Sequence, residues 1–103
     1  MRVPILLALA MCSTTVWAAT VVGGTLHRST LREWHQATSA NQYATAADIV
    51  ERFLNIRDPL ALAPKVRDVH ACISRVSGDF KLRTQSVSDT AIACMAELGY
   101  FPR

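Results

Sequence analysis

The sequence lacks the residue patterns on which most enzyme and metal sites depend. It contains no C-x-x-C pair, so a redox-active dithiol is not expected. His70 lies two residues before Cys72, but no second histidine stands at metal-ligand spacing, which argues against a zinc site. No serine stands in a nucleophile-elbow motif, and no pair of catalytic carboxylates can be assigned. We therefore expect no enzyme activity, no cofactor and no metal.

Strand-type alternation and a dense basic stripe are also missing. No segment alternates apolar and polar residues between turn signals, which argues against a β fold. The formal net charge is only +3, and acidic residues are interleaved with the lysines and arginines in the middle of the chain. Because no aromatic stacking platform accompanies these mixed charges, no nucleic-acid partner is expected.

No charged residue occurs between residues 3 and 26, and the start of this stretch is typical of an export signal. Arg2 supplies a positive charge, residues 3–11 form an apolar core, and Val16 and Ala18 fit the small-x-small cleavage rule. We predict a signal peptide over residues 1–18 and a periplasmic or secreted mature chain, with no stable membrane insertion after cleavage. That chain would have about 85 residues, a size at which the hydrophobic core is thin.

Two alternatives for this segment stay open. The uncharged run is long enough to span a bilayer as an uncleaved anchor, although polar residues from Cys12 to Thr15 interrupt it. Residues 9–12 also resemble a bacterial lipobox, in which Cys12 would carry lipid, although Met11 stands where that motif has a small residue.

The two remaining cysteines are the clearest structural signal. Removal of Cys12 with the signal would leave Cys72 and Cys94, an even number in an oxidising compartment. We expect these two residues to form a disulfide. In the chain-entropy model, closing a loop of this length stabilises the fold by about 3 kcal/mol.

Capping motifs and apolar periodicity predict the first two helices. Thr30 and Glu33 form a capping box that opens a short helix over residues 31–37. Ser39 and Gln42 form a second box, which opens a helix over residues 40–56. The apolar stripe of this second helix is the most regular in the chain and consists of Tyr43, Ala46, Ala47, Val50, Phe53 and Leu54.

Prolines separate the second helix from a third. A proline is tolerated in a loop or a first helical turn, so the third helix is predicted to begin near Pro64. It should end at Gly78, in the left-handed conformation of a helix C-cap. In the following connection, Phe80 and Leu82 are expected to tuck under the bundle.

Ser86 is expected to cap the last helix, and Gly99 to close it. Cys72 and Cys94 both fall on the apolar stripes of the third and fourth helices. These two helices should therefore pack as an antiparallel pair that is bridged on its buried side.

The predicted fold class is all-α, a small bundle of about four helices with one interhelical disulfide. The expected organisation is a signal peptide over residues 1–18, a flexible leader over residues 19–29 and a disulfide-stapled helical domain over residues 30–103.

Aromatic residues near arginines are the candidate partner contacts, because both residue types dominate binding hot spots. They are Trp34, Tyr100 and Phe101. The alternative for Trp34 is that it anchors the first helix on the core, and the alternative for Tyr100 and Phe101 is that they fold back on the core. His70 is expected to be partly buried and hydrogen-bonded.

In size, helical content and single disulfide, the predicted domain resembles small acid-stress chaperones of the bacterial periplasm. Those proteins place their first cysteine beside an early tryptophan, whereas Trp34 is followed here by His35. Periplasmic immunity proteins that block wall-degrading effectors are also similar in size and helical content. Both resemblances imply an architecture and carry over no site residue.

Elimination leaves protein binding as the expected function. We expect an inhibitor, immunity factor or accessory subunit of the cell envelope with an unknown protein partner. The alternatives are an acid-stress chaperone and a lipid-tethered envelope subunit.

Overall fold

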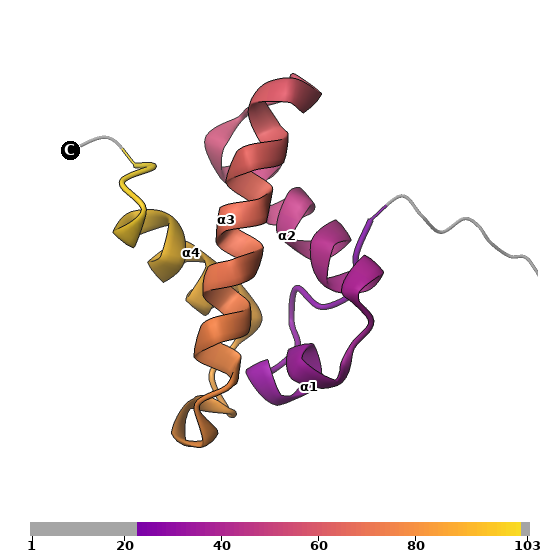
Figure 1. Cartoon of the computed structure of the whole chain (residues 1–103), viewed down its shortest axis with the longest axis vertical. Coiled ribbons are helices and arrows are strands. Elements are labelled where there is room, and N and C mark those ends of the chain that lie inside the picture. Colours follow the sequence, from indigo (N-terminus) through magenta and orange to yellow (C-terminus); the bar gives the residue numbers. More distant parts are fainter. Residues whose placement is uncertain (1–22, 102–103) are drawn as a thin grey trace, which may run out of the picture.

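The computed structural model describes residues 23–101, which form four α-helices and one short 3-10 helix (Figure 1). The helices are α1 (Leu31–Gln36), α2 (Ser39–Leu54), α3 (Pro59–Ser77) and α4 (Val87–Glu97), with η2 (Phe80–Leu82) between α3 and α4. Within residues 23–101 the only β pairing is an isolated antiparallel bridge between Thr30 and Ser86. The all-α prediction is confirmed for this part of the chain. The predicted signal peptide, residues 1–18, lies outside it.

Helix α3 is the centre of the fold. It packs against α1, α2 and α4, and α4 runs back along it after the turn at η2 (Figure 1). The largest side chains without exposed surface come from all four helices and include Leu31, Trp34, Val50, Ile73 and Met95. Burial of this apolar set is the main force that holds the helices together.

The predicted cysteine pair is present at disulfide distance. The Sγ atoms of Cys72 and Cys94 lie 2.04 Å apart and their Cα atoms 6.0 Å apart. Both residues are buried, so the bridge joins α3 to α4 from the inside of the pair, as the coincidence of the two stripes predicts.

The helix caps agree with the predictions at α1 and α4 and differ at α2. Thr30 and Glu33 form the predicted box, and Ser86 accepts the Asp89 backbone N–H at 2.9 Å. At α2 the cap is Thr38, whose hydroxyl accepts the Asn41 N–H at 3.2 Å, so the predicted box at Ser39 is wrong by one residue. The side chain of Gln42 is thereby free to bind elsewhere.

Helix α3 begins five residues earlier than predicted. Asp58 is its N-cap and Pro59 is its first residue, where the missing proline N–H costs nothing. Pro64 therefore lies inside the helix, where it cannot donate to the carbonyl of Leu60. Gly78 also differs, because its φ of −75° is right-handed; the left-handed residues are Asn55, which ends α2, and Gly99 after α4.

Residues 23–29, predicted to be part of a flexible leader, are packed against α2 and α4. Leu26 is buried, and its N–H donates to the Thr45 hydroxyl at 3.2 Å. The Gly24 N–H donates to Asp48 at 3.0 Å, and the hydroxyl of Ser88 donates to the His27 carbonyl. Residues 19–22 lie outside the described part of the chain.

The buried face of α2 includes Ala46 and Val50 of the predicted stripe and extends beyond it toward the docked leader. Thr45 and Ile49 lie beneath it and are buried, although neither belongs to that stripe. Tyr43 and Phe53, which do belong to it, are 41% and 49% exposed. The apolar period of α2 predicted only part of its buried face, because α2 also packs against the leader, a segment with no periodicity of its own.

Replacing Gly24 with alanine is expected to destabilise the leader. A Cβ at Gly24 would overlap the backbone of Thr45, which cannot move without bending α2. We expect a loss of about 1–3 kcal/mol in the free energy of unfolding, and faster hydrogen exchange at the Leu26 amide. Gly78→Ala is the control, because Gly78 has a helical φ and its Cβ would make only ordinary contacts. Equal stability of the two variants would contradict the packing described.

Candidate functional site

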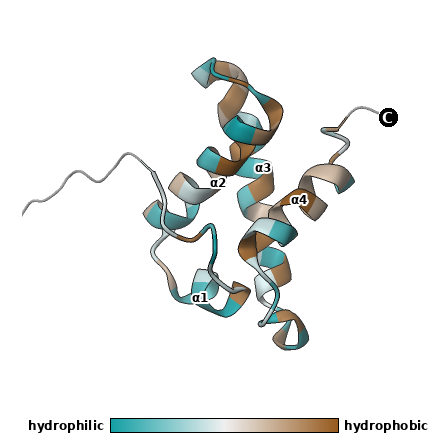
Figure 2. Cartoon of the chain, turned by 180° about the vertical axis from the view of Figure 1, so that it is seen from behind, coloured by the Kyte–Doolittle hydropathy of each residue, from teal (hydrophilic) through white to brown (hydrophobic). Residues whose placement is uncertain are grey.

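The most exposed apolar surface lies where α3 starts beside α2. Leu60 is 86% exposed, and a hollow of about 510 Å³, lined in part by the preceding residue Pro59, opens between the two helices. We call Leu60 and this hollow the α2–α3 apolar surface. Hydrophobic residues are concentrated on these first turns of α3 (Figure 2). The hollow is lined by Tyr43, Ala44, Ala47, Pro59, Leu62, Ala63 and Val66.

The early start of α3 creates this surface. Six consecutive apolar residues, 59–64, become helical, and a helix of that composition cannot turn all of them toward one core. Leu62 is half-buried, whereas Leu60 and Ala63 are left in solvent. Alanines on both walls of the hollow keep it open enough for an inserted side chain.

A polar network closes the end of this surface nearest to α1. The rings of His70 and Tyr43 are stacked, with centroids 3.8 Å apart and planes within 9°. Nε2 of His70 lies 3.0 Å from the Gln42 side-chain oxygen, and the Gln42 amide donates to the Trp34 carbonyl at 2.7 Å. The prediction of a partly buried, hydrogen-bonded His70 is confirmed, and burial lowers the pKa of its imidazole.

This burial makes stability depend on pH. Since the pKa of His70 is lowered on folding, the unfolded chain binds the proton more tightly, and the free energy of unfolding should fall as the pH drops below about 6.5. The loss should stop once the pH is below the pKa of the folded state. An NMR titration of the His70 ring should give a midpoint below 6.5, and His70→Gln should remove this part of the pH dependence. A midpoint at or above 6.5 would contradict the burial.

The three aromatic residues expected at a partner contact occupy different environments. Trp34 has no exposed surface, and its indole N–H donates to the Ser74 hydroxyl at 3.2 Å. Trp34 therefore acts as the anchor of α1 and offers a partner no contact area. Tyr100 and Phe101 are half-buried and pack against the core, so they fold back as the second alternative allowed.

Tyr100 is held by charged residues of α3. Its hydroxyl lies 3.4 Å from the Asp68 carboxylate, and the Lys65 ammonium lies 4.1 Å from the centre of its ring. Burial, with a smaller contribution from Asp68, raises the pKa of the phenol. The residues after α4 are thus tied to the middle of α3.

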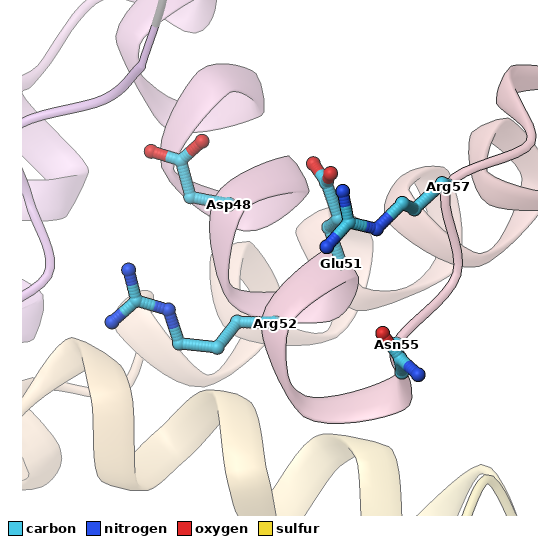
Figure 3. A pocket seen from close by; sticks show the side chains of 5 residues that line it. All are labelled: Asp48, Glu51, Arg52, Asn55 and Arg57. Carbon is cyan, nitrogen blue, oxygen red and sulfur yellow. The ribbon is translucent and has the colours of Figure 1, made fainter.

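A charged hollow of about 380 Å³ lies at the end of α2 (Figure 3). Asp48, Glu51, Arg52 and Arg57 contribute two carboxylates and two guanidinium groups, and Asn55 adds an amide. Glu51 and Arg57 point toward each other in this view, while Asp48 and Arg52 lie on the other side. Because the opposite charges are balanced, the hollow favours neither a cation nor an anion.

Asp48 has a structural role that explains part of this arrangement. Its carboxylate accepts from the Gly24 N–H at 3.0 Å and from His27 Nε2 at 3.1 Å, and so binds the leader to α2. Ser88 lines the same hollow of about 230 Å³ as His27 and Asp48. Its hydroxyl donates to the backbone carbonyl of His27 and not to the ring, so the three residues do not form a nucleophile–base–acid chain.

Residues 23–101 lack two further features. None of the helices there is long and apolar enough to cross a bilayer. In the same residues, no three or more His, Cys, Asp or Glu side chains are grouped in a way that could hold a metal ion.

Sequence reasoning missed the residues that are most exposed. The predicted start of the third helix near Pro64 lies after Leu60, and Phe80, which is 75% exposed, was expected beneath the bundle. A run of six apolar residues between Asp58 and Lys65 was the available signal for the first of these. No protein-family model, curated protein or solved structure matches the chain, so its possible activities are inferred from this geometry alone.

Proposed function

We propose that this chain is a small exported helical protein that acts by binding another protein, as an inhibitor, immunity factor or accessory factor of the cell envelope. The observation that supports the proposal is the α2–α3 apolar surface. Single exposed hydrophobic residues are normal on soluble domains, whereas a larger apolar patch marks an interaction site; here an apolar hollow adds to the exposed Leu60 on the first turns of α3. The groove between two helices suits an amphipathic helix of the partner.

The proposal of export is supported by the cysteine pair and the uncharged N-terminal run. A pair at disulfide distance is consistent with an oxidising compartment, because cytosolic proteins rarely keep such bridges. Mass spectrometry of the mature N-terminus tests this part. Cleavage after Ala18 supports a secretory signal, whereas an intact N-terminus indicates an anchor, and lipid on Cys12 indicates a tethered subunit.

Photocrosslinking tests the binding surface. A benzoylphenylalanine residue at Leu60, in the full chain expressed in its own cells, should give one discrete protein adduct. The same group at Arg75, an exposed residue in the last turn of α3, is the positional control and should give none. Equal yields at both positions, or no adduct at Leu60, would argue against the proposed surface.

Two Ala→Asp substitutions, one inside the hollow and one outside it, provide the matched control for this adduct. Ala63→Asp places a carboxylate in the hollow and should abolish the crosslink from position 60, because an apolar partner side chain cannot bury an unpaired charge. Ala71→Asp makes the same change at an exposed site of α3 outside the hollow and should leave the adduct unchanged.

An acid-stress chaperone is the second candidate function, and Asp48 is the observation that favours it. One carboxylate accepts from both Gly24 and His27, so two contacts of the leader depend on this single acceptor. Release of the leader would uncover Ile49 and Leu26, which are apolar. Far-UV circular dichroism and hydrophobic-dye binding from neutral pH to about pH 2 distinguish the candidates. A fold that stays intact and binds no dye would eliminate the chaperone.

A further inference from the structure

A second groove lies at the opposite end of α3 from the α2–α3 apolar surface. It opens between α1 and the connection around η2, near the C-terminal end of α3 in Figure 1, and has a volume of about 750 Å³. Thr30, Arg32 and Glu33 contribute to one wall, and Phe80, Arg83 and Thr84 form the other. We call it the α1–η2 groove.

Backbone hydrogen bonds hold the two walls together. The Leu31 N–H donates to the Gln85 carbonyl at 2.9 Å, and the Arg32 N–H donates to the Arg83 carbonyl at 3.1 Å. A backbone hydrogen bond therefore joins Arg32 and Arg83 directly, although they are about fifty residues apart in the chain. The spacing of the two arginines is set before any ligand arrives.

Phe80 and Arg83 form a preorganised pair on the second wall. Phe80 is 75% exposed, and the Arg83 guanidinium carbon lies 4.9 Å from the centre of its ring. Stacking on an aromatic ring orients the guanidinium plane while its N–H groups remain available to an acceptor in that plane. An aromatic ring beside an arginine is the composition typical of binding hot spots.

The groove has a net positive charge, because two arginines and one acidic residue line it. Glu33, the only acidic residue in its walls, uses its carboxylate in the cap of α1, where it accepts the Thr30 N–H at 2.8 Å. Within residues 23–101 no carboxylate lies within 4.0 Å of the guanidinium groups of Arg32 and Arg83 or the ammonium group of Lys81. The complementary ligand is therefore negatively charged.

We propose that the α1–η2 groove binds an acidic segment of a partner polypeptide. Arg32 and Arg83 hold side-chain carboxylates of that segment, and Phe80 packs against an apolar side chain next to them. Guanidinium groups bind carboxylates through paired, charge-assisted hydrogen bonds, which makes the contact directional as well as electrostatic. This inference goes beyond the proposed function, since it concerns a different surface and specifies the chemistry of its ligand.

The groove fits an acidic peptide better than a phosphate polymer. Phosphate polymers bind along extended basic tracks, where affinity grows with the number of contacted charges. Here only two arginines and one aromatic ring line the groove, and Glu33 adds a negative charge that would repel a phosphate polymer. An alternating acidic and apolar sequence matches this composition.

Peptide titration tests the inference. The probe is a fluorescein-labelled peptide of four Glu-Leu repeats. A Gln-Leu peptide of equal length is the uncharged control. Each peptide is added to the ¹⁵N-labelled mature chain at low ionic strength. The Glu-Leu peptide should shift the backbone amide signals of α1 and residues 79–85 and should bind at least tenfold more tightly than the Gln-Leu peptide. Binding should weaken as salt is added, because exposed charges are screened.

Substitutions then assign the effect to the groove. Arg83→Gln and Arg32→Gln should each weaken the Glu-Leu peptide about tenfold, and Phe80→Ala about fivefold. Arg67→Gln removes an equal charge from an exposed site on the other half of α3 and should change binding less than twofold. Thermal unfolding of each variant checks that it is folded.

Three outcomes would overturn the inference. They are equal affinity for the two peptides, equal weakening by Arg67→Gln and Arg83→Gln, and signal shifts outside α1 and residues 79–85. Tighter binding of inorganic polyphosphate than of the Glu-Leu peptide at the same residues would overturn it too, because the groove would then be a general anion site. None of these results bears on Leu60, so the proposed function is tested separately.

Discussion

Replacing Cys72 and Cys94 together with alanine is expected to lower the free energy of unfolding by about 3 kcal/mol. The bridge spans 22 positions and joins the central helix α3 to α4, so its removal restores conformational freedom mainly to the unfolded chain. A domain of this size has a total stability of about 5–10 kcal/mol, so the variant should keep only a narrow margin.

Urea unfolding followed by circular dichroism measures this effect. The unmodified chain treated with a thiol reductant is the control, because it loses the bridge without changing the sequence and should approach the stability of the double variant. A change below about 0.5 kcal/mol would mean that the two sulfurs do not constrain the unfolded chain. Two free thiols in the purified mature protein would contradict the bridge directly.

Replacing Trp34 with alanine is expected to cost about 3–5 kcal/mol, the largest effect of any single substitution proposed for this chain. The indole has no exposed surface, lies 5.6 Å from the His70 ring between centroids and donates to Ser74. Its removal would leave a cavity beneath α1. Ser74 would lose its hydrogen bond, and His70 would lose the neighbouring ring. Helix α1 has only six residues and depends on this anchor.

The same urea experiment tests Trp34, with two comparisons. Trp34→Phe keeps most of the volume and loses the hydrogen bond, so it should cost less than Trp34→Ala. Phe80→Ala removes an aromatic ring that is mostly exposed and should change stability by less than about 0.5 kcal/mol. Similar costs for Trp34→Ala and Phe80→Ala would show that Trp34 does not anchor α1 in the core.

The two surfaces proposed here occupy the two ends of α3. The α2–α3 apolar surface contains Leu60, at the start of this helix, and the α1–η2 groove contains Phe80, just beyond its end. Because the two binding tests use substitutions at opposite ends, an effect at one surface can be measured without disturbing the other.

Most of α4 and the cysteine pair were predictable because their signals are local. The Ser86 hydroxyl accepts a hydrogen bond from the Asp89 N–H, only three residues away, and the buried stripe of α4 repeats within two turns. Cys72 and Cys94 each fall on such a stripe, so their pairing required only that the two stripes face each other. The capping box at Thr30 was predictable for the same reason.

The start of α3 and the packing of the leader were not predictable in this way. Pro64 indicates a helix start when it is considered with its neighbours, yet Asp58 and Pro59 provide an earlier start that is equally acceptable. The leader has no period, and it packs through backbone groups of Gly24 and Leu26 that no sequence pattern reports. Its partners, Thr45 and Asp48, are about twenty residues away.

The sequence by itself determined the helical class, two of the helix caps and the cysteine pair, because each depends on residues within a few positions or on a simple apolar period. Only the tertiary structure decided which apolar side chains are left in solvent. Leu60 stays in solvent because no distant segment covers the early first turn of α3, and the paired backbones of residues 29–32 and 83–87 hold the connection that carries Phe80 beside α1. Both candidate binding surfaces are therefore products of packing between segments that are far apart in the chain.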